Sequence, residues 1–510
     1  MPKPIIDWQK ISAKKFIKLL GIKPESFWVK RGEAMTLQLF NQMATRVPAY
    51  RNFLRKSGIK PQRIKSISNF KKIPTISKDS YLKKYDLGNL CWDGEFSSRH
   101  WDVSSTSGST GVPYYFPRSD RQNAQYAFTA ELYLRNNFFI HKKTTLYVNC
   151  FALGVWIGGL FTYEALKLLT RHGVYGLTVI NPGLNKIEIL KAISRLGGDF
   201  DQVIIGGYPP FVKDVIDDGS THGVDWKKYN IKFIFSAEGF SEKFRDYIFA
   251  CSEAKNIYLD SLNHYGTVDQ GTLAHETPLS VMIRRLALKD AKLYSAIFGA
   301  NDSQLPTLAQ YHPELFYFEE INGSLLCSAY SGLPLVRYDL KDYGGVVGFE
   351  EMKNIFFEHG YDLWREAKKA KINKTVWQIP FVYVRARKDL SVSLSGANIY
   401  PETIKNVLIY PEFSKTLTGK FTLLVKHDKN QNPFLELNIE LKKNVSMPSL
   451  NFKKRLVATV VAQLLKENSE YKIIHDTHKR KRGAYPVVVF HYYESDPYFR
   501  SGGKQKWVIK

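Results

Sequence analysis

TTLYVNC, at residues 144–150, is followed by GGLFTYEALKLLTRHG at 158–173 and VYGLTVI at 174–180. The first and last stretches are short and apolar, which predicts strands, and the middle stretch has the spacing of an amphipathic helix ending in glycine. Further strands are predicted at 203–207 (VIIGG) and 232–239 (KFIFSAEG). Strands that alternate with helices of this length predict a parallel sheet in an α/β layer arrangement.

A separate alternation follows residue 388. We expect a turn at Ser395–Gly396, a helix at 401–410, strands at 420–427 and 434–441, and a helix at 451–468. These elements form a small α+β module. The sequence therefore predicts a large N-terminal α/β domain over residues 1–387, with layered sheets and helices, and a small, mobile C-terminal α+β domain over residues 388–510.

The bulk composition indicates a folded, water-soluble chain. Its 510 residues are enough for two or three domains, and 14% aromatic residues favour large cores. No apolar run reaches the roughly 18 residues of a membrane span, and the N-terminus lacks an apolar signal core. Four widely spaced cysteines predict a reduced protein, so we expect a cytoplasmic location.

The charge balance is unusual. The formal net charge is +25, and the densest basic run covers residues 478–482 (HKRKR). Such a charge suits a nucleic acid, a phosphate-rich small molecule or an anionic membrane surface. No zinc-finger spacing or RNA-binding aromatic motif accompanies it, which makes nucleic acid the less favoured partner. The run 478–482 is equally compatible with a solvated face and an anion-binding patch.

Residues 104–113 read SSTSGSTGVP, between flanks that predict two short strands. A Ser/Gly-rich run is often a linker, but a loop of this composition between strands offers hydroxyls, backbone N–H groups and close backbone approach. These are the groups that bind a polyphosphate. We therefore interpret the stretch as a phosphate-binding loop.

Five further motifs follow in order: FSAEGFSEKFRDYIF (235–249), NHYGTVDQG (263–271), SGLPLVRYDLKDYGG (331–345), RARKDLSVSLSGANIYPETI (385–404) and SGGKQKW (501–507). Together they resemble the phenylacetate–CoA ligase-like branch of the AMP-forming adenylating enzymes, from about residue 36 to the C-terminus. The resemblance implies that ATP and Mg²⁺ activate a carboxylic acid as an acyl-adenylate, with release of pyrophosphate. A thiol, that of coenzyme A, or alternatively an amine then captures the acyl group.

The resemblance also implies roles for individual residues. The loop that would hold the β- and γ-phosphates comprises Thr106, Ser107, Gly108, Ser109, Thr110 and Gly111. Val112 stands where the family usually has lysine, and Arg118 is the candidate replacement. Lys504 resembles the mobile lysine that contacts the α-phosphate and the carboxylate, with Lys506 and Lys510 as weaker candidates.

The nucleoside is expected to contact three motifs. Residues that would line the adenine pocket or stack on the base are Ala237, Glu238, Gly239, Tyr265 and Gly266. Thr267 would meet the α-phosphate, and Asp269, where the family has glutamate, would hold Mg²⁺. Asp342 would accept hydrogen bonds from both ribose hydroxyls, because its two oxygens suit a vicinal diol. Arg387 would contact the nucleotide at the domain junction, where Asp389 resembles the hinge residue.

Other interpretations remain open or are excluded. The substrate pocket is expected to include residues 206–210 and Phe235, without specifying an aryl, alkyl or sugar acid. A degenerate nucleotide- or nucleic-acid-binding protein on this scaffold is the alternative of a different class. His275–Glu276 is not part of an HExxH zinc motif, and no G-x-S-x-G hydrolase motif is present.

Overall fold

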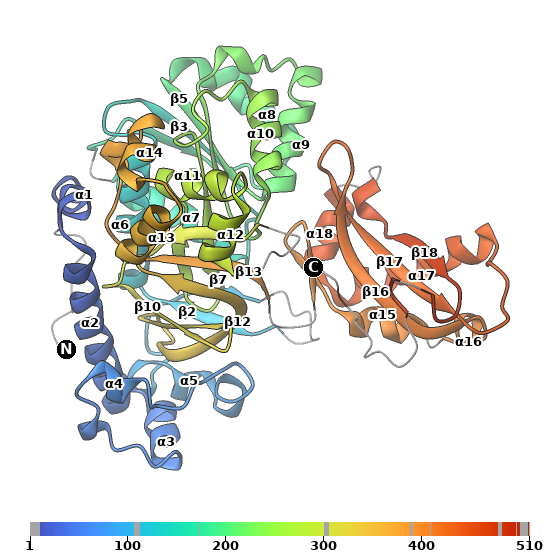
Figure 1. Ribbon diagram of the computed structural model, residues 1–510, viewed down its shortest axis with the longest axis horizontal. Helices are drawn as coiled ribbons and strands as arrows, with labels where there is room; N and C mark the ends of the chain where they lie inside the picture. Colours follow the sequence, from blue (N-terminus) through green and yellow to red (C-terminus); the bar gives the residue numbers. More distant parts are fainter. Residues whose placement is uncertain are drawn as a thin grey trace. The chain divides into compact units, whose positions relative to one another are not determined.

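The parallel strands expected from residues 144–207 form one end of the large sheet of the large unit (Figure 1). The computed structural model describes residues 11–106, 113–171, 173–299, 305–387, 391–408, 410–477, 482–495, 497–499 and 508. The chain divides into two compact units. One comprises residues 1–104, 115–207 and 212–386, and the other comprises residues 105–114, 208–211 and 387–510.

The large unit contains an eleven-stranded sheet in the order β10-β11-β12-β13-β9-β8-β7-β6-β5-β3-β4. Strands β3 to β7 run parallel, and β7 turns back antiparallel into β8. The strands are β3 (Thr145–Cys150), β4 (Leu177–Ile180), β5 (Gln202–Gly207), β6 (Ile231–Phe235), β7 (Ser261–Thr267), β8 (Gly271–His275), β9 (Thr307–Gln310), β10 (Phe316–Ile321), β11 (Ser324–Ala329), β12 (Leu335–Val347) and β13 (Phe381–Arg387). A separate pair, β1 (Asp102–Ser105) and β2 (Tyr115–Arg118), flanks the Ser/Gly loop as expected.

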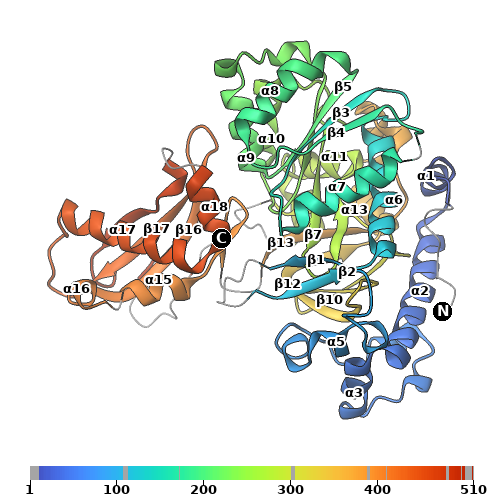
Figure 2. The same ribbon diagram turned by 180° about the vertical axis from the view of Figure 1, so that it is seen from behind.

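Helices cover both faces of the parallel strands, which explains why β3, β5 and β6 are buried along their whole length. Helices α6 and α7 share one apolar cluster with β3 to β7 (Figure 2), while α10 packs Phe249 against Phe233 of β6. The helices are α6 (Asp120–Asn137), α7 (Ile157–Thr170), α8 (Lys186–Leu196), α9 (Pro209–Asp218), α10 (Glu242–Ser252), α11 (Pro278–Ala287), α12 (Ala291–Phe298), α13 (Phe349–Glu358) and α14 (Leu363–Lys369). The predicted fold class is confirmed.

A helical segment precedes the sheet. It comprises α1 (Ala13–Ile22), α2 (Glu25–Arg46), α3 (Pro48–Lys56), α4 (Ile67–Phe70) and α5 (Leu87–Leu90). Aromatic contacts hold it together: Phe40 of α2 lies 6.2 Å from Tyr50 of α3 and 6.1 Å from Phe70 of α4, ring centre to ring centre. Among the described helices, none is both long and apolar enough to cross a membrane.

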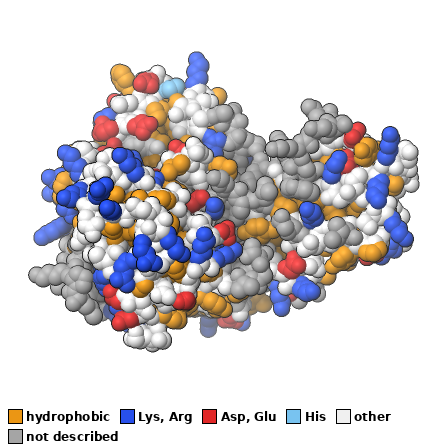
Figure 3. Space-filling view, turned by 90° about the horizontal axis from the view of Figure 1, so that it is seen from below, with side chains coloured by type: hydrophobic (Ala, Val, Ile, Leu, Met, Phe, Trp, Pro, Cys, Tyr) orange, Lys and Arg blue, Asp and Glu red, His pale blue; other side chains and the backbone are white. Residues whose placement is uncertain are grey.

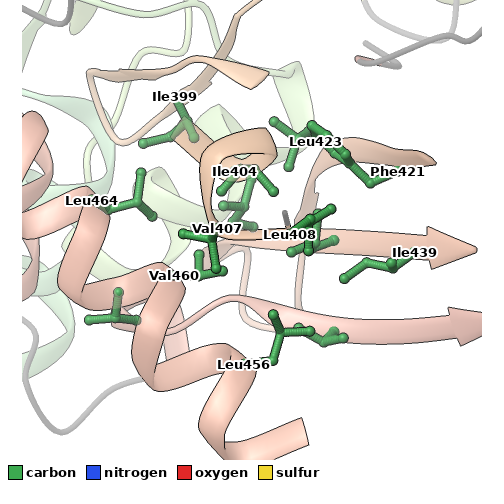
Figure 4. Packing of buried hydrophobic residues seen from close by; sticks show 14 of the residues in the cluster. Ile399, Ile404, Val407, Leu408, Phe421, Leu423, Ile439, Leu456, Val460 and Leu464 are labelled. Carbon is green, nitrogen blue, oxygen red and sulfur yellow. The ribbon is translucent and has the colours of Figure 1, made fainter. Parts of the chain in front are cut away.

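The smaller unit has its own apolar core (Figure 4). Strand β16 (Leu417–His427) pairs antiparallel with β17 (Pro433–Leu441), which pairs parallel with β18 (Val487–His491). The helices are α15 (Pro401–Leu408), α16 (Pro411–Ser414), α17 (Leu450–Glu467) and α18 (Ser469–Thr477). Ile404, Val407 and Leu408 of α15 are fully or almost fully buried in this core. The α+β elements expected after residue 388 are therefore present, with α16, α18, β18 and two short hairpin strands in addition.

The turn at Ser395–Gly396 joins β14 (Val392–Leu394) to β15 (Ala397–Ile399). Both turn residues have positive φ, 50° for Ser395 and 91° for Gly396. A two-residue hairpin loop with two positive φ angles matches the right-handed twist of its strands, which explains the Ser-Gly pair.

Three histidines lie in the core of the large unit, on and next to the antiparallel strands. The ring of Tyr133 lies 5.0 Å from that of His264 and 5.1 Å from that of His275, and Trp377 lies 5.6 Å from His312. In the part of the chain that the structure describes, Nε2 of each histidine has no hydrogen-bond partner. Burial lowers the pKa of His264 and His312 to about 3 and that of His275 to about 4, so all three are neutral at pH 7.

These shifts predict that stability falls in mild acid. Below the ordinary histidine pKa of about 6.5 the unfolded chain takes up protons, whereas the folded chain does not until about pH 3–4. Urea unfolding should therefore show a loss of about 1 kcal/mol per histidine between pH 7 and 5.5. His275→Gln should reduce this pH dependence, and a variant with the wild-type dependence would contradict the assignment.

Candidate functional site

The candidate nucleotide site lies at the carboxyl ends of the parallel strands. Residues 236–239 leave the end of β6, and Tyr265, Gly266 and Thr267 form the end of the neighbouring strand β7. Ligands of open α/β sheets commonly bind at this edge. The fold thus places two motifs that are separated in the sequence on adjacent strand ends.

A hydrogen bond brings a third motif to this edge. The Oη atom of Tyr265 donates to Oδ2 of Asp342 at 2.6 Å, although the two residues are 77 positions apart. Both side chains are buried, with 8% and 7% exposure. The residue expected to stack on adenine and the carboxylate expected to bind ribose are therefore in direct contact.

Asp342 reaches this position because β12 is irregular. Ser324 of β11 pairs with Tyr343, but Leu326, two residues further along, pairs with Asp339, which leaves extra residues in β12. Lys341, in the bulge, has a φ of 61°, and its backbone N–H donates to Oδ1 of Asp339 at 3.0 Å. A bulge of this kind redirects the side chains that follow it, here Asp342.

The loop after β6 is fixed by β7. The side-chain amide of Asn263 donates to the backbone oxygen of Glu238 at 3.1 Å. Ala237 has a φ of 82°, a region that costs an L-residue strain and that often occurs at ligand sites. Gly239 has no room for a side chain, because a Cβ atom would lie 2.8 Å from Oγ1 of Thr307.

The hairpin between β7 and β8 carries the remaining predicted nucleotide contacts. A Cβ atom on Gly266 would lie 2.6 Å from the oxygen of Gly271, so the close pairing of the two strands requires glycine. Oγ1 of Thr267 accepts the backbone N–H of Gln270 at 3.3 Å. Asp269 is half-buried in the turn between the two strands.

The side chains of the candidate site could bind magnesium only together with the phosphates of a substrate. Within the described ranges no group of three or more His, Cys, Asp or Glu side chains could hold a metal ion. Magnesium is commonly held by one or two carboxylates and the phosphates of the substrate, while keeping several waters. The single carboxylate of Asp269 fits that pattern.

The Ser/Gly loop is described only at its base. The backbone N–H of Thr106 donates to the oxygen of Tyr114 at 2.9 Å, and the N–H of Tyr114 donates to Oγ1 of Thr106 at 3.0 Å. The other residues of the loop lie outside the described residues: Ser107, Gly108, Ser109, Thr110, Gly111 and Val112. Thr106 therefore closes the base of the loop.

Arg118, the candidate replacement for the missing lysine, is 3% exposed. Its Nη1 donates to Oγ of Ser104 at 2.5 Å, and its guanidinium lies 5.1 Å from the ring centre of Phe161. Burial lowers the pKa of Arg118 to about 10. The guanidinium therefore stays charged at neutral pH.

The structure describes only some of the remaining predicted residues. Arg387 ends β13, whereas Asp389, Lys504, Lys506 and Lys510 lie outside the described residues. Of the expected substrate pocket, Gly206 and Gly207 end β5. Phe235 is fully buried, with its ring 5.0 Å from that of Phe240.

A buried ion network lies directly behind the site, and sequence reasoning missed it. Arg245 and Arg284 bind Glu242 and Glu276, with all four side chains at most 4% exposed. Arg245 contacts both oxygens of Glu276 at 2.9 Å, and Arg284 contacts one at 2.6 Å. Burial alone would raise the pKa of Glu242, but Arg245 and Arg284 lower it to about 2.

The network is connected to the site through backbone groups. Oε2 of Glu276 accepts the backbone N–H of Asn263 at 2.9 Å, and Arg284 donates to the backbone oxygen of Phe240 at 2.7 Å. These contacts fix β7 at Asn263 and the loop after β6 at Phe240. The sequence signal that could have revealed the ion network is the placement of charged residues among the apolar positions of α10 and α11.

Comparison with family models and with curated proteins finds no match to this sequence. Solved structures do match in fold. The crystal structure of 2-hydroxyisobutyryl-CoA ligase in complex with 2-HIB-AMP and CoA, in the thioesterification state, aligns with a TM-score of 0.64 and 14% identity, over 99% of this chain and 94% of that one. The same ligase in the postadenylation state with 2-HIB-AMP aligns with a TM-score of 0.56 and 13% identity, over 99% and 94% of the two chains. The chain therefore has the fold of adenylate-forming enzymes, including a C-terminal domain.

The network predicts a large cost for losing one carboxylate. Glu276→Gln removes one negative charge from between two buried arginines, and breaking such a pair typically costs about 3–5 kcal/mol. Chemical unfolding should show this loss of unfolding free energy. Asp246→Asn is the control, because Asp246 pairs with Arg285 but is 53% exposed, and an exposed pair contributes at most about 1 kcal/mol. Equal effects of the two substitutions would contradict the role of the network.

Proposed function

We propose that the protein activates a carboxylic acid with ATP, forming an acyl-adenylate and pyrophosphate, and then transfers the acyl group to coenzyme A. The observation that carries this proposal is the contact between Tyr265 and Asp342 at the carboxyl edge of the sheet. The fold supports it, since the similar ligase binds 2-HIB-AMP and CoA in its crystal structures. The order of the sequence motifs favours the phenylacetate–CoA ligase-like branch.

The residues at the edge provide complementary contacts for a nucleoside. In this proposal Asp342 accepts hydrogen bonds from the ribose hydroxyls, and the ring of Tyr265 stacks on adenine while its hydroxyl holds the carboxylate in place. Residues 237–239 border the base, with Glu238 fixed through its backbone oxygen by Asn263. Thr267 contacts the α-phosphate.

Phosphates and metal occupy the remaining positions. Residues 106–111 surround the β- and γ-phosphates, and Arg118 and Arg387 add positive charge. Asp269 would hold Mg²⁺, which would supply positive charge to a leaving pyrophosphate. Lys504 contacts the α-phosphate and the reacting carboxylate, as a flexible ammonium is suited to do.

The proposal also specifies which molecule accepts the acyl group. Coenzyme A makes the protein an acyl-CoA ligase, whereas an amine acceptor makes it an amide-forming ligase. Consumption of free thiol during turnover separates the two. A protein that binds nucleotide without adenylating a carboxylate is the alternative of a different class.

ATP affinity should depend on Asp342. Asp342→Ala removes charged hydrogen bonds to the ribose, which typically contribute about 2–3 kcal/mol, so the Kd for ATP should rise about 30- to 150-fold by calorimetry. Tyr265→Phe is the matched variant: it keeps the ring and the carboxylate and should change the Kd only a few-fold. Unchanged ATP affinity of Asp342→Ala would show that the ribose assignment is wrong.

Lys504 should act in one half-reaction only. Lys504→Ala removes a contact to charge that develops during adenylation, so acyl-adenylate formation should slow by about 10²–10³-fold. Transfer from a supplied acyl-adenylate to coenzyme A should barely change. Equal slowing of both half-reactions would indicate general damage to the C-terminal domain, and Lys506→Ala and Lys510→Ala serve as controls within the same tail.

A further inference from the structure

One stretch of the N-terminal helical segment carries positive charge only. Residues 51–78 contain nine lysines and arginines and no aspartate or glutamate. The eight that fall within residues 51–72 are all exposed, and we call their side chains together the basic face. Figure 3 views the molecule from the side on which α3 and α4 lie in Figure 1, and lysine and arginine side chains gather there.

The scaffold presents these side chains in fixed positions. Helix α3 buries Tyr50 and Leu54 and exposes Arg51 and Arg55 on its other side. The chain that follows is anchored by Phe70 of α4, whose ring is fully buried. The stretch thus contributes apolar side chains to the core and basic side chains to the solvent.

The basic face has no acidic residue in its own stretch of sequence with which to pair. In the part of the chain that the structure describes, no side chain of the basic face forms an ion pair. Elsewhere some exposed lysines pair with an acid three residues away, as in Lys191–Glu188 and Lys369–Glu366, whereas others, such as Lys227 and Lys289, form no ion pair within the described chain. The Lys83–Asp79 pair, at 2.7 Å, lies just beyond the basic face.

Unpaired like charges oppose folding. Arg51 and Arg55 are four residues apart on one helix, a spacing at which like charges repel, and the surrounding residues supply no acid to offset this. Helix packing does not require the charge, because the buried contacts of α3 are made by its apolar side. A partner that supplies negative charge would turn the repulsion into attraction.

We propose that the basic face docks the protein on an anionic phospholipid surface. Polybasic segments are attracted to such a surface by about 1 kcal/mol per lysine or arginine, without inserting apolar side chains. No large apolar side chain between residues 51 and 72 is exposed, which fits attraction to head groups and excludes an anchor in the acyl chains. The stretch also lacks the exposed aromatic rings on which single-stranded nucleic acid stacks.

Vesicle co-sedimentation of the full-length protein tests this proposal. The protein should bind vesicles of phosphatidylcholine with about 30 mol% phosphatidylserine, should not bind phosphatidylcholine alone, and should be released by salt at about 0.5 M. The combined variant Arg55→Gln, Lys56→Gln, Lys60→Gln and Arg63→Gln should weaken the binding about a thousand-fold. The temperature of thermal unfolding should equal or exceed that of the wild type, because the substitutions relieve repulsion. The ATP affinity should be unchanged, because the substitutions lie outside the candidate nucleotide site.

A control variant that removes the same number of positive charges from other elements tests whether vesicle binding is specific to the basic face. Lys227→Gln, Lys228→Gln, Lys289→Gln and Lys292→Gln remove four exposed charges from other elements and should leave vesicle binding nearly unchanged. Equal loss in both variants would overturn the proposal, since net charge would then explain the binding. Wild-type protein that ignores anionic vesicles would overturn it as well. Tight binding of a DNA duplex that is lost only in the first variant would assign the basic face to nucleic acid instead.

Discussion

The buried pairing of Arg245 and Arg284 with Glu242 and Glu276 is the constraint on which the candidate site depends. Two arginines that are almost completely removed from water are tolerated only because two carboxylates share them. The network also contacts the backbone, through the N–H of Asn263 and the oxygen of Phe240. The charges therefore fix the spacing between the ends of β6 and β7, and with it the positions of the motifs that those strand ends carry.

Much of the fold could be predicted from local patterns. The strand and helix periodicities of residues 144–207 and of the C-terminal unit were sufficient, because each element buries its own apolar residues. The ion network and the bulge at Lys341 could not be predicted, since both depend on contacts between segments far apart in the sequence. The motifs of the site were recognisable, but the contact between Tyr265 and Asp342 required the folded sheet.

The positive charge of the chain, formally +25, serves different purposes in different places. Arg245 and Arg284 are buried and paired with carboxylates, and they organise the core behind the site. The basic face of residues 51–72 is exposed and unpaired within the described chain, and packing gives no reason for it. In the functions proposed above, the nucleotide binds at the sheet edge and the lipid surface binds the separate helical segment, so the two could be bound at once.

Acid-dependent exchange of pyrophosphate into ATP tests the central claim most directly. The wild-type protein, incubated with ATP, Mg²⁺, labelled pyrophosphate and a panel of aryl, alkyl and sugar carboxylic acids, should show exchange that depends on at least one acid. Exchange requires reversible formation of an acyl-adenylate, so a positive result establishes adenylation whichever acceptor follows. ATP binding that depends on Asp342 but gives no acid-dependent exchange across the panel would contradict the account and identify a nucleotide-binding protein without ligase activity.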